Sequence, residues 1–497
     1  MLPIPMTTST ASSPTAQPSP VTRAPVLAVL LSALLLAAHA SAQEFIAKPY
    51  LQPGPQGPVG PTDTLFLRWI TDSTPGNFTV TVQPAKGQSR AVAVTREPLE
   101  FAQPKQSLLR YTARIDGLPT DSSFRYSVQL NGTPVRQVTA RTRATPGKPV
   151  RLALMGDMAS GKPGQQKIAH QIALADPHAV ITLGDIVYKY GRMSEYTQHF
   201  WHTYANAPEP SPTAGAPLMG GVVFHATLGN HDAFVGRLNT YDDALAAHLV
   251  FTAPLTGPAT PGPWATQLPK GPVADRFRRL AGPAYPALSL HSYDHGDIHF
   301  AVIDNSGGGK SDDPAVARWL EQDLRASKAR WKAVLMHCPP FQVSVAHYPE
   351  QRQRRLAPLL EACKVDLVLS GHVHNYQRSH PLRFQPFPGT PKGASSSAYV
   401  NGSFAIDTTF DGADDTTPDG VLYIVAGGGG TTLNKTPVKD NLEDLPEESR
   451  DNFAPFNATT FATDNSFVLL ETSGSRLTLR ALDSNGKEID LVAIDKK

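Results

Sequence analysis

The sequence is poor in cysteine and nearly balanced in charge, and both features limit what the protein can do. Its 497 residues include two cysteines, Cys338 and Cys363, so disulfide bonds are not its main source of stability. Two unpaired thiols are the expected state, with a bridge between them as the alternative. Lys and Arg number 45 against 43 Asp and Glu, a net charge of +2. Nucleic-acid-binding proteins usually carry a clear basic excess, so we expect no nucleic-acid partner.

The apolar run near the beginning of the sequence is too short to span a membrane. It extends from Ala24 to Ala38, whereas a spanning helix needs about 20 apolar residues. Arg23 precedes the run and Ala40-Ser41-Ala42 follows it, which is the order of a secretory signal peptide. We therefore predict a signal peptide at 1–42 and a secreted or periplasmic protein without membrane contact after cleavage. An uncleaved membrane anchor is the alternative, and the oligomeric state is not indicated.

Prolines and glycines are frequent, and the region 44–143 alternates between apolar and polar residues. The 46 prolines and 38 glycines indicate many turns. Leu65, Leu67 and Trp69 share one face of a predicted strand. Another alternating segment runs into Asn131-Gly132, a strong hairpin signal. The pattern predicts a small all-β sandwich over 44–143, similar to a fibronectin type III module, and a linker at 144–149.

From residue 150 to the end, short apolar runs alternate with helical patterns, which predicts an α/β domain over 150–497. Helices are expected at 314–327 and 351–362, and long surface insertions near the site at 207–221 and 254–286. A closing antiparallel meander is expected from 466 to 493. The expected strands in the first part of this domain are 150–155, 179–183, 222–228, 298–303, 331–336, 365–369 and 421–426.

Polar residues of the kind that bind hard metal ions follow five of these apolar runs. They are Gly156-Asp157, Gly184-Asp185-Ile-Val-Tyr188, Gly229-Asn230-His231-Asp232, His337 and Gly371-His372-Val-His374. In an open α/β sheet the carboxyl ends of neighbouring strands converge on one crevice. Residues two apart on an extended segment also point the same way, as His372 and His374 would. The five blocks together predict a single metal-binding site.

In this order the five blocks resemble the motif set of the purple acid phosphatases, which belong to the calcineurin-like metallophosphoesterases. The resemblance covers essentially the whole mature chain and implies a four-layer domain, a β-sandwich core flanked by helices. It assigns three ligands to each of two metal ions and one bridging ligand. The first metal takes Asp157, Tyr188 and His374, the second takes Asn230, His337 and His372, and Asp185 bridges them.

The donor types agree with a site for one trivalent and one divalent metal ion. A phenolate and carboxylates suit Fe(III), so Fe(III) is expected at the Tyr188 site, and imidazoles with an amide suit divalent Zn, Mn or Fe at the second. A packed tyrosine is the alternative for Tyr188. The sequence departs from the family pattern at Ala159, where glycine is usual, and at Cys338, which follows a predicted ligand.

The resemblance implies a phosphatase that hydrolyses small phosphomonoesters by attack of a metal-bound hydroxide. Two histidines would act on the substrate: His231, next to the ligand Asn230, and His347, ten residues after His337. A surface histidine is the alternative for His347. A phosphodiesterase or nucleotidase would use the same metals, and a non-catalytic surface-binding protein is the alternative from another class.

Overall fold

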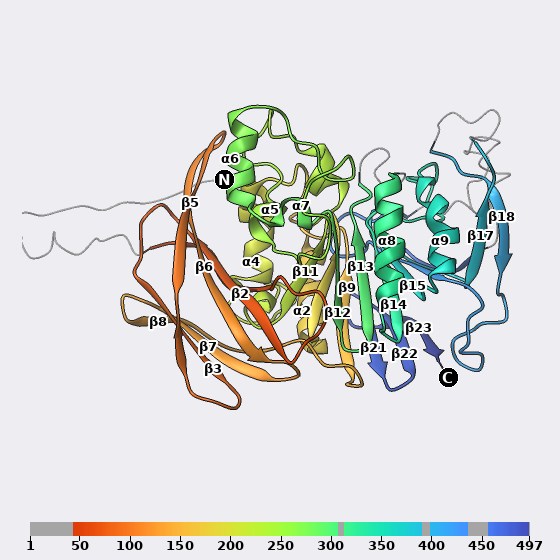
Figure 1. Ribbon diagram of the computed structural model, residues 1–497, viewed down its shortest axis with the longest axis horizontal. Helices are drawn as coiled ribbons and strands as arrows, with labels where there is room; N and C mark the ends of the chain where they lie inside the picture. The colour runs from red at the N-terminus through yellow and green to blue at the C-terminus, as the bar shows by residue number, and fades with distance from the viewer. Residues whose placement is uncertain (1–42, 307–312, 390–397, 436–455, 497) are drawn as a thin grey trace, which may run out of the picture. The chain divides into compact units, whose positions relative to one another are not determined.

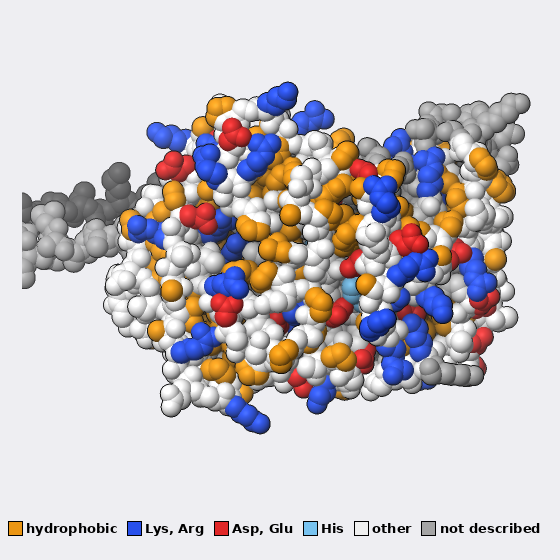
Figure 2. Space-filling model, in the orientation of Figure 1, with side chains coloured by type: hydrophobic (Ala, Val, Ile, Leu, Met, Phe, Trp, Pro, Cys, Tyr) orange, Lys and Arg blue, Asp and Glu red, His pale blue; other side chains and the backbone are white. Residues whose placement is uncertain are grey.

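The computed structural model describes residues 43–306, 313–389, 398–435 and 456–496. Within it, Glu44–Lys497 forms one compact unit. The signal peptide predicted at 1–42 lies outside the described residues. Among the described helices, none is long and apolar enough to cross a membrane. Figure 2 shows acidic and basic side chains interspersed over the face that it draws.

The first eight strands form two four-stranded antiparallel sheets that share one core (Figure 1). The strand orders are β1-β2-β6-β5 and β4-β3-β7-β8. The strands are β1 (Phe45–Pro53), β2 (Thr62–Thr71), β3 (Phe78–Pro84), β4 (Arg90–Val92), β5 (Val94–Ala102), β6 (Lys105–Pro119), β7 (Ser123–Leu130) and β8 (Thr133–Arg141). We call this part the β-module.

The β-module has the alternation that the sequence predicts. Leu65, Leu67 and Trp69 of β2 are buried between the two sheets. The predicted hairpin is confirmed, since β7 and β8 pair across Asn131 and Gly132, whose φ angles are 52° and 82°. Positive φ at both positions is what a tight type I′ turn requires. The likeness to a fibronectin type III module stays a prediction.

Buried hydrogen bonds connect the β-module to the rest of the unit. Arg110 on β6 donates from Nη1 to the carbonyl of Leu249 at 2.5 Å and from Nη2 to the carbonyl of Leu280 at 2.6 Å. At the end of the module, Arg143 forms a buried ion pair of 2.9 Å with Asp63 on β2 and also donates from Nη1 to the carbonyl of Asp294, outside the module, at 3.2 Å. Because an unpaired buried charge is costly, these contacts require both parts to be present.

The remainder of the chain is built around two mixed sheets. One has the order β11-β10-β9-β21-β22-β23 and the other β12-β13-β14-β15-β19-β16-β20. The first contains β9 (Val150–Met155), β10 (Ala179–Leu183), β11 (Val223–Thr227), β21 (Ser466–Ser473), β22 (Arg476–Asp483) and β23 (Glu488–Asp495). The second contains β12 (Leu290–His295), β13 (Ile298–Ile303), β14 (Trp331–Leu335), β15 (Leu367–Ser370), β16 (Tyr376–Ser379), β19 (Leu422–Ala426) and β20 (Asn457–Phe461), and a separate hairpin contains β17 (Leu382–Pro386) and β18 (Gly402–Ile406).

The two sheets face each other, and helices cover their outer faces. Leu154 and Ile181 of the first sheet share one core with Phe300 and Leu335 of the second. The helical segments are α2 (Pro163–Ala175), α3 (Met193–Glu195), α4 (Trp201–Tyr204), α5 (Ala247–Val250), α6 (Pro272–Ala281), α7 (Ala284–Ala287), α8 (Pro314–Ala326) and α9 (Ala357–Ala362). Helix α2 packs on the first sheet, whereas α8 and α9 pack on the second (Figure 1). The expected arrangement of helix, sheet, sheet and helix is therefore observed.

The predicted helix at 351–362 is partly wrong. The chain instead forms a 3₁₀ turn at Arg352–Leu356, and α9 begins only at Ala357. Pro358 has no N–H to donate to the carbonyl four residues earlier, and its ring crowds that turn, so a continuous α-helix cannot form. The expected helix at 314–327 is confirmed as α8, which ends one residue earlier at Ala326.

The two expected insertions are not simple surface loops. In 207–221, Met219 is fully buried and the carbonyl of Gly220 accepts a 2.7 Å hydrogen bond from the buried hydroxyl of Tyr126 in the β-module. A buried tyrosine hydroxyl needs such a partner, which draws this segment inward. The second insertion, 254–286, contains helix α6, whose Phe277 is buried.

Candidate metal centre

The side chains singled out in the sequence lie at the carboxyl ends of strands, where the edges of the two sheets meet. A 2.8 Å hydrogen bond from His337 Nδ1 to the carbonyl of Leu183 joins the two edges. Asp157 follows β9, Asp185 and Tyr188 follow β10, Asn230 and His231 follow β11, His337 follows β14, and His372 and His374 follow β15. The structure thus brings together residues that are up to 217 positions apart.

One group of donor atoms consists of a carboxylate, a phenol and an imidazole. The hydroxyl of Tyr188 donates to Asp157 Oδ1 at 2.9 Å and lies 3.3 Å from His374 Nε2. The same Asp157 oxygen lies 3.3 Å from His374 Nε2. The other oxygen, Oδ2, accepts a 2.7 Å hydrogen bond from the backbone N–H of His372. Three donors of different chemistry therefore face one small space.

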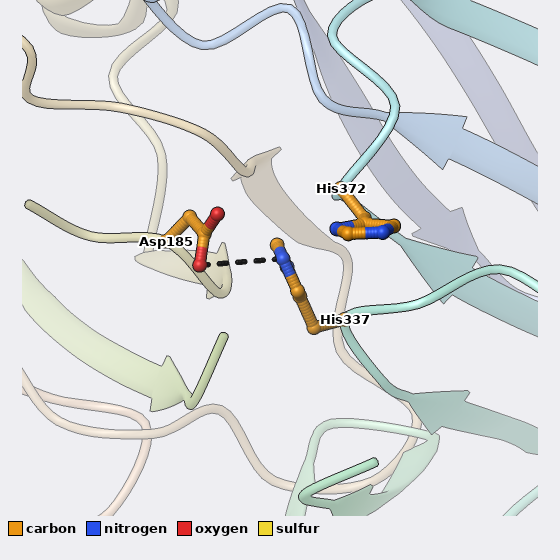
Figure 3. Close-up of side chains that lie close together, drawn as sticks. All are labelled: Asp185, His337 and His372. Carbon is orange, nitrogen blue, oxygen red and sulfur yellow. Dashed lines mark ion pairs between the residues drawn. The ribbon is translucent and has the colours of Figure 1, made fainter. Parts of the chain in front are cut away.

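A second group is formed by Asn230, His337 and Asp185. His337 Nε2 lies 3.0 Å from Asn230 Oδ1 and 3.3 Å from Asp185 Oδ1. His372 joins this group, because its donor atom and those of Asp185 and His337 all lie within 4.8 Å of one another. Figure 3 shows these three side chains turned toward one another, with the ion pair between Asp185 and His337 dashed.

The spacing of both groups fits the ligands of metal ions. Two ligands that each bind an ion at about 2.1 Å, at right angles, are about 3.0 Å apart. The donor separations of 2.9 to 3.3 Å in the first group and 3.0 to 3.3 Å in the second match that value. Two groups of this kind, side by side, could hold two ions.

Backbone carbonyls fix the orientation of the histidine rings. Nδ1 of His337 faces the carbonyl of Leu183 at 2.8 Å, and Nδ1 of His374 faces that of Thr432 at 2.7 Å. A carbonyl only accepts hydrogen bonds, so Nδ1 carries a proton and Nε2 is the nitrogen that faces the centre. Orientation by a second partner of this kind is typical of histidines that bind metal.

The backbone is strained at three of the predicted ligands, where the chain leaves the strands. Asp157, Asp185 and His372 have φ angles of 59°, 50° and 67°, in the left-handed region that non-glycine residues rarely adopt. Conformations of this kind cost free energy and cluster at functional sites. Gly184, with φ at 84°, precedes Asp185, and a Cβ there would lie 2.5 Å from the ring of His337. Only glycine fits at that position.

Charge at the centre is arranged for a cation. Burial raises the pKa of the Tyr188 phenol well above its usual value, and the nearby carboxylates of Asp157 and Asp185 raise it further. Burial lowers the pKa of His337, but Asp185 outweighs it and raises the value to about 10. Burial would raise the pKa of Asp185, whereas His337 lowers it below its usual range. The carboxylates thus attract whatever positive charge is present.

The structure also places both predicted catalytic histidines at the centre. His231 donates its backbone N–H to Asp185 Oδ1 at 2.8 Å, its Nδ1 faces the carbonyl of Lys189 at 2.6 Å, and its ring lies 4.6 Å from that of Tyr188. The ring of His347 lies 4.0 Å from that of His372. His347 is therefore not an isolated surface histidine.

Sequence reasoning missed two residues that support the centre. Glu350 bridges two imidazoles, with Oε1 2.9 Å from His347 Nδ1 and Oε2 2.9 Å from His372 Nε2. Asn305 Oδ1 accepts the backbone N–H groups of His337 and Cys338 at 3.0 and 2.9 Å. A signal existed for Asn305, because it follows the predicted strand at 298–303 as the other polar blocks follow theirs. For Glu350, the only signal in the sequence was its spacing of three residues from His347.

The two cysteines are free and buried, as expected. The donor atom of Cys338 lies within 4.8 Å of those of Glu350 and His372. Burial raises the pKa of its thiol well above the usual value, and Glu350 adds to the effect.

Comparison with known proteins agrees with this geometry. Residues 150–376 match the family model of the calcineurin-like phosphoesterases, and this range contains all nine predicted site residues. Residues 150–376 form a calcineurin-like phosphoesterase domain. This phosphoesterase is a hydrolase of phosphoric esters, and its family implies binding of two metal ions, so the predicted family and enzyme class are confirmed.

Relatives of the phosphoesterase include purple acid phosphatases. An uncharacterized protein of Mycobacterium tuberculosis is 25% identical over 397 residues, which cover 74% of this chain and 67% of that protein. Purple acid phosphatase 1 of Ipomoea batatas is 26% identical over 240 residues, 47% of this chain and 44% of that enzyme.

Solved structures show the same fold. Purple acid phosphatase PPD1 from yellow lupin (Lupinus luteus) seeds superposes with a TM-score of 0.61 at 18% identity, covering 90% of this chain and 74% of that chain. PhoD superposes with a TM-score of 0.52 at 13% identity, covering 90% of this chain and 93% of its own.

Proposed function

We propose that the protein is a secreted dinuclear-metal phosphatase that hydrolyses phosphomonoesters. The observation that supports this most directly is the pair of donor groups at the sheet edges. Asp185 lies 3.3 Å from His337 in the second group, and its charge also raises the pKa of Tyr188 in the first. A bridging carboxylate of this kind allows two ions to act on one substrate.

The residues favour different ions in the two groups. Asp157, Tyr188 and His374 would hold Fe(III), because a phenolate and a carboxylate are hard anionic donors. The amide of Asn230 and the imidazoles of His337 and His372 would hold divalent Zn, Mn or Fe, and Asp185 would bridge. When bound, such a pair lowers the pKa of a coordinated water and neutralises phosphate charge.

The chain's own side chains would supply the proton transfer and hold the phosphate. With Nδ1 of His231 bound to the carbonyl of Lys189, only Nε2 is free to turn toward the centre, 3.8 Å from Asp185 Oδ2. A protonated Nε2 can donate to a phosphoryl oxygen or to the departing alkoxide. Glu350 holds Nδ1 of His347 in the same way, at 2.9 Å, which orients its Nε2.

A matched pair of substrates tests the proposal. We expect the purified protein to contain two metal ions per chain and to hydrolyse 4-nitrophenyl phosphate with a higher kcat/KM than bis(4-nitrophenyl) phosphate, which has the same leaving group. A preference for the diester would indicate a phosphodiesterase. Absence of turnover with two metals bound would indicate a non-catalytic binding protein.

Secretion is tested separately by the mass of the exported protein. Cleavage after Ala42 predicts an N-terminus at Gln43. Recovery of the uncleaved chain in the membrane fraction would contradict this and support the anchor.

A further inference from the structure

A hollow of about 410 Å³ is lined by the segment that follows His231. One wall is the segment 233–239, which continues the short π-helix that begins at His231. The opposite wall is 263–269, part of the second insertion. Phe234 lies on this π-helix three residues after His231, within the same turn. The volume is in the range of pockets that bind small organic ligands, about 300 to 1,000 Å³.

The wall formed by 233–239 exposes an aromatic ring. Phe234 is 50% exposed, unlike most large apolar side chains of the described chain, which are buried. An exposed phenyl ring is unfavourable in water unless another surface covers it. Here the ring lines a hollow, so a flat apolar group that enters could stack on it.

Two polar groups of the same hollow have no partner among the described residues. Arg237 is exposed and forms no ion pair or side-chain hydrogen bond with them. Thr266 is only 2% exposed, and its hydroxyl has no hydrogen-bond partner in that part of the chain. Its backbone is fixed, because the hydroxyl of Tyr285 donates to its carbonyl at 2.9 Å. A buried hydroxyl without a partner is costly, and a polar atom of a ligand would satisfy it.

We propose that this hollow binds the alcohol part of the substrate, and that this part is a planar aromatic group with an anionic substituent. The inference rests on the proposed phosphatase function and names its substrate class. The ring stacks on Phe234, the anion pairs with the Arg237 guanidinium, and the hydroxyl of Thr266 bonds a polar atom of the ring system. The phosphate then lies at the centre, beside His231.

The test compares kcat/KM for three monoesters: phenyl phosphate, 4-carboxyphenyl phosphate and glycerol 2-phosphate. Each variant is compared with the parent on the same substrate, so differences in leaving-group reactivity cancel. Phe234→Ala should lower kcat/KM about 3- to 10-fold for both aromatic esters and less than twofold for glycerol 2-phosphate. Arg237→Gln should lower it about 10-fold for the carboxyphenyl ester alone.

Two variants of residues that do not line the hollow serve as controls. Phe387→Ala removes another exposed phenyl ring, which is 57% exposed, and Arg96→Gln removes an exposed cation on β5 of the β-module. Both variants should have the same kcat/KM as the parent on all three substrates. Equal losses on all three substrates for Phe234→Ala, or no loss for either hollow variant, would overturn the proposal while leaving the phosphatase function intact.

Binding of the free alcohol separates this inference from the proposed function. In calorimetry, 4-hydroxybenzoate should bind the parent, and Arg237→Gln should weaken that binding about 10-fold. If the metal-loaded parent hydrolyses no ester but binds 4-hydroxybenzoate through Arg237, the phosphatase function is wrong and the binding site stands. If neither binding nor selective loss is seen, the hollow is not a substrate site.

Discussion

At the scale of single residues, Tyr188 is the donor whose chemistry depends most on a cation. Its hydroxyl donates to Asp157 at 2.9 Å, and both burial and the neighbouring carboxylates hold its pKa well above the usual value. A phenol in these surroundings loses its proton only when a strongly charged ion takes the proton's place. Tyr188 would therefore report directly on an ion bound by the first group.

Tyr188→Phe should remove the visible absorption of iron-loaded protein, since it removes the phenolate oxygen and keeps the ring. The free energy of unfolding of the metal-free protein should fall by only about 1 kcal/mol, because one hydrogen bond is lost and Asp157 keeps its other partners. Absorption spectra and denaturant titrations measure the two effects. An unchanged spectrum with iron present would remove Tyr188 from the ligand set.

Replacement of histidines should divide them into two classes. His374→Ala should lower metal content and activity together, whereas His231→Ala and His347→Ala should keep two metals and lose about 10- to 1,000-fold in turnover. The loss for the variant that lacks the general acid should be smaller for 4-nitrophenyl phosphate than for an alkyl phosphate, because nitrophenolate leaves without a proton. If His347→Ala turns over both substrates like the parent, its place beside His372 has no role in catalysis.

The sequence predicted the residues of the centre better than their supports. The proposed ligands could be found because each ends an apolar run, and strand ends converge. Glu350 could not be found this way, since it lies on an irregular segment between β14 and α9 and reaches His372 only through the tertiary fold. Its role depends on packing that local pattern does not encode.

At the scale of elements, the turns that leave the strands hold the centre together. Gly184 and Gly132 have nearly the same φ, 84° and 82°, but different surroundings. A Cβ at Gly184 would lie 2.5 Å from the ring of His337, whereas at Gly132 it would meet nothing within 4 Å. Substitutions at these two positions therefore distinguish the cost of positive φ from the effect of displacing His337.

Gly184→Ala should therefore lower both metal affinity and stability, because the added methyl group pushes His337 away from Asn230 and Asp185. Gly132→Ala should cost only the strain of positive φ, about 1 to 2 kcal/mol, and leave metal content unchanged. Metal analysis and chemical denaturation of both variants measure the difference. Equal effects of the two substitutions would show that the position of His337 is not set by this turn.

Strands were predicted more accurately than the segments between them. Apolar runs such as 150–155 and 298–303 match β9 and β13, since strands buried on both faces are continuous apolar runs. The helix expected at 351–362 was only partly right, because Pro358 limits the α-helix to Ala357–Ala362. Burial of the segment 216–220 depends on Tyr126, which is about ninety residues away in sequence, and no local pattern reveals it.

At the scale of the whole molecule, two buried histidines make the free energy of unfolding fall on either side of neutral pH, one in acid and the other in base. Burial and Arg143 lower the pKa of His295 to about 3, so this ring stays neutral in the fold and takes up a proton on unfolding. Burial opposes the charged form of His299, but Asp294 and Asp323, hydrogen-bonded to its two nitrogens, raise its pKa to about 9. The first ring destabilises the fold in acid, and the second stabilises it until the pH approaches 9.

His295→Leu should reduce the loss of stability as the pH falls from about 6.5 toward 4, by on the order of 3 kcal/mol. His299→Gln should remove the stability that the charged ring supplies below pH 6.5. The difference from the parent should therefore shrink as the pH rises toward 9. The free energy of unfolding of metal-free protein, measured from pH 4 to 9, gives both slopes. Parallel curves for the parent and His295→Leu would show that this ring is already charged in the fold.

Arg110 has a consequence for how this enzyme can change over evolutionary time. It reaches from the β-module to the carbonyl of Leu280, at the end of the helix in the insertion that also walls the hollow at Phe234. A module replaced by an unrelated one would leave that carbonyl and the carbonyl of Leu249 without their donor. We therefore expect lineages to exchange the module and the insertion as one inherited block, so that a new appendage arrives together with a new substrate preference.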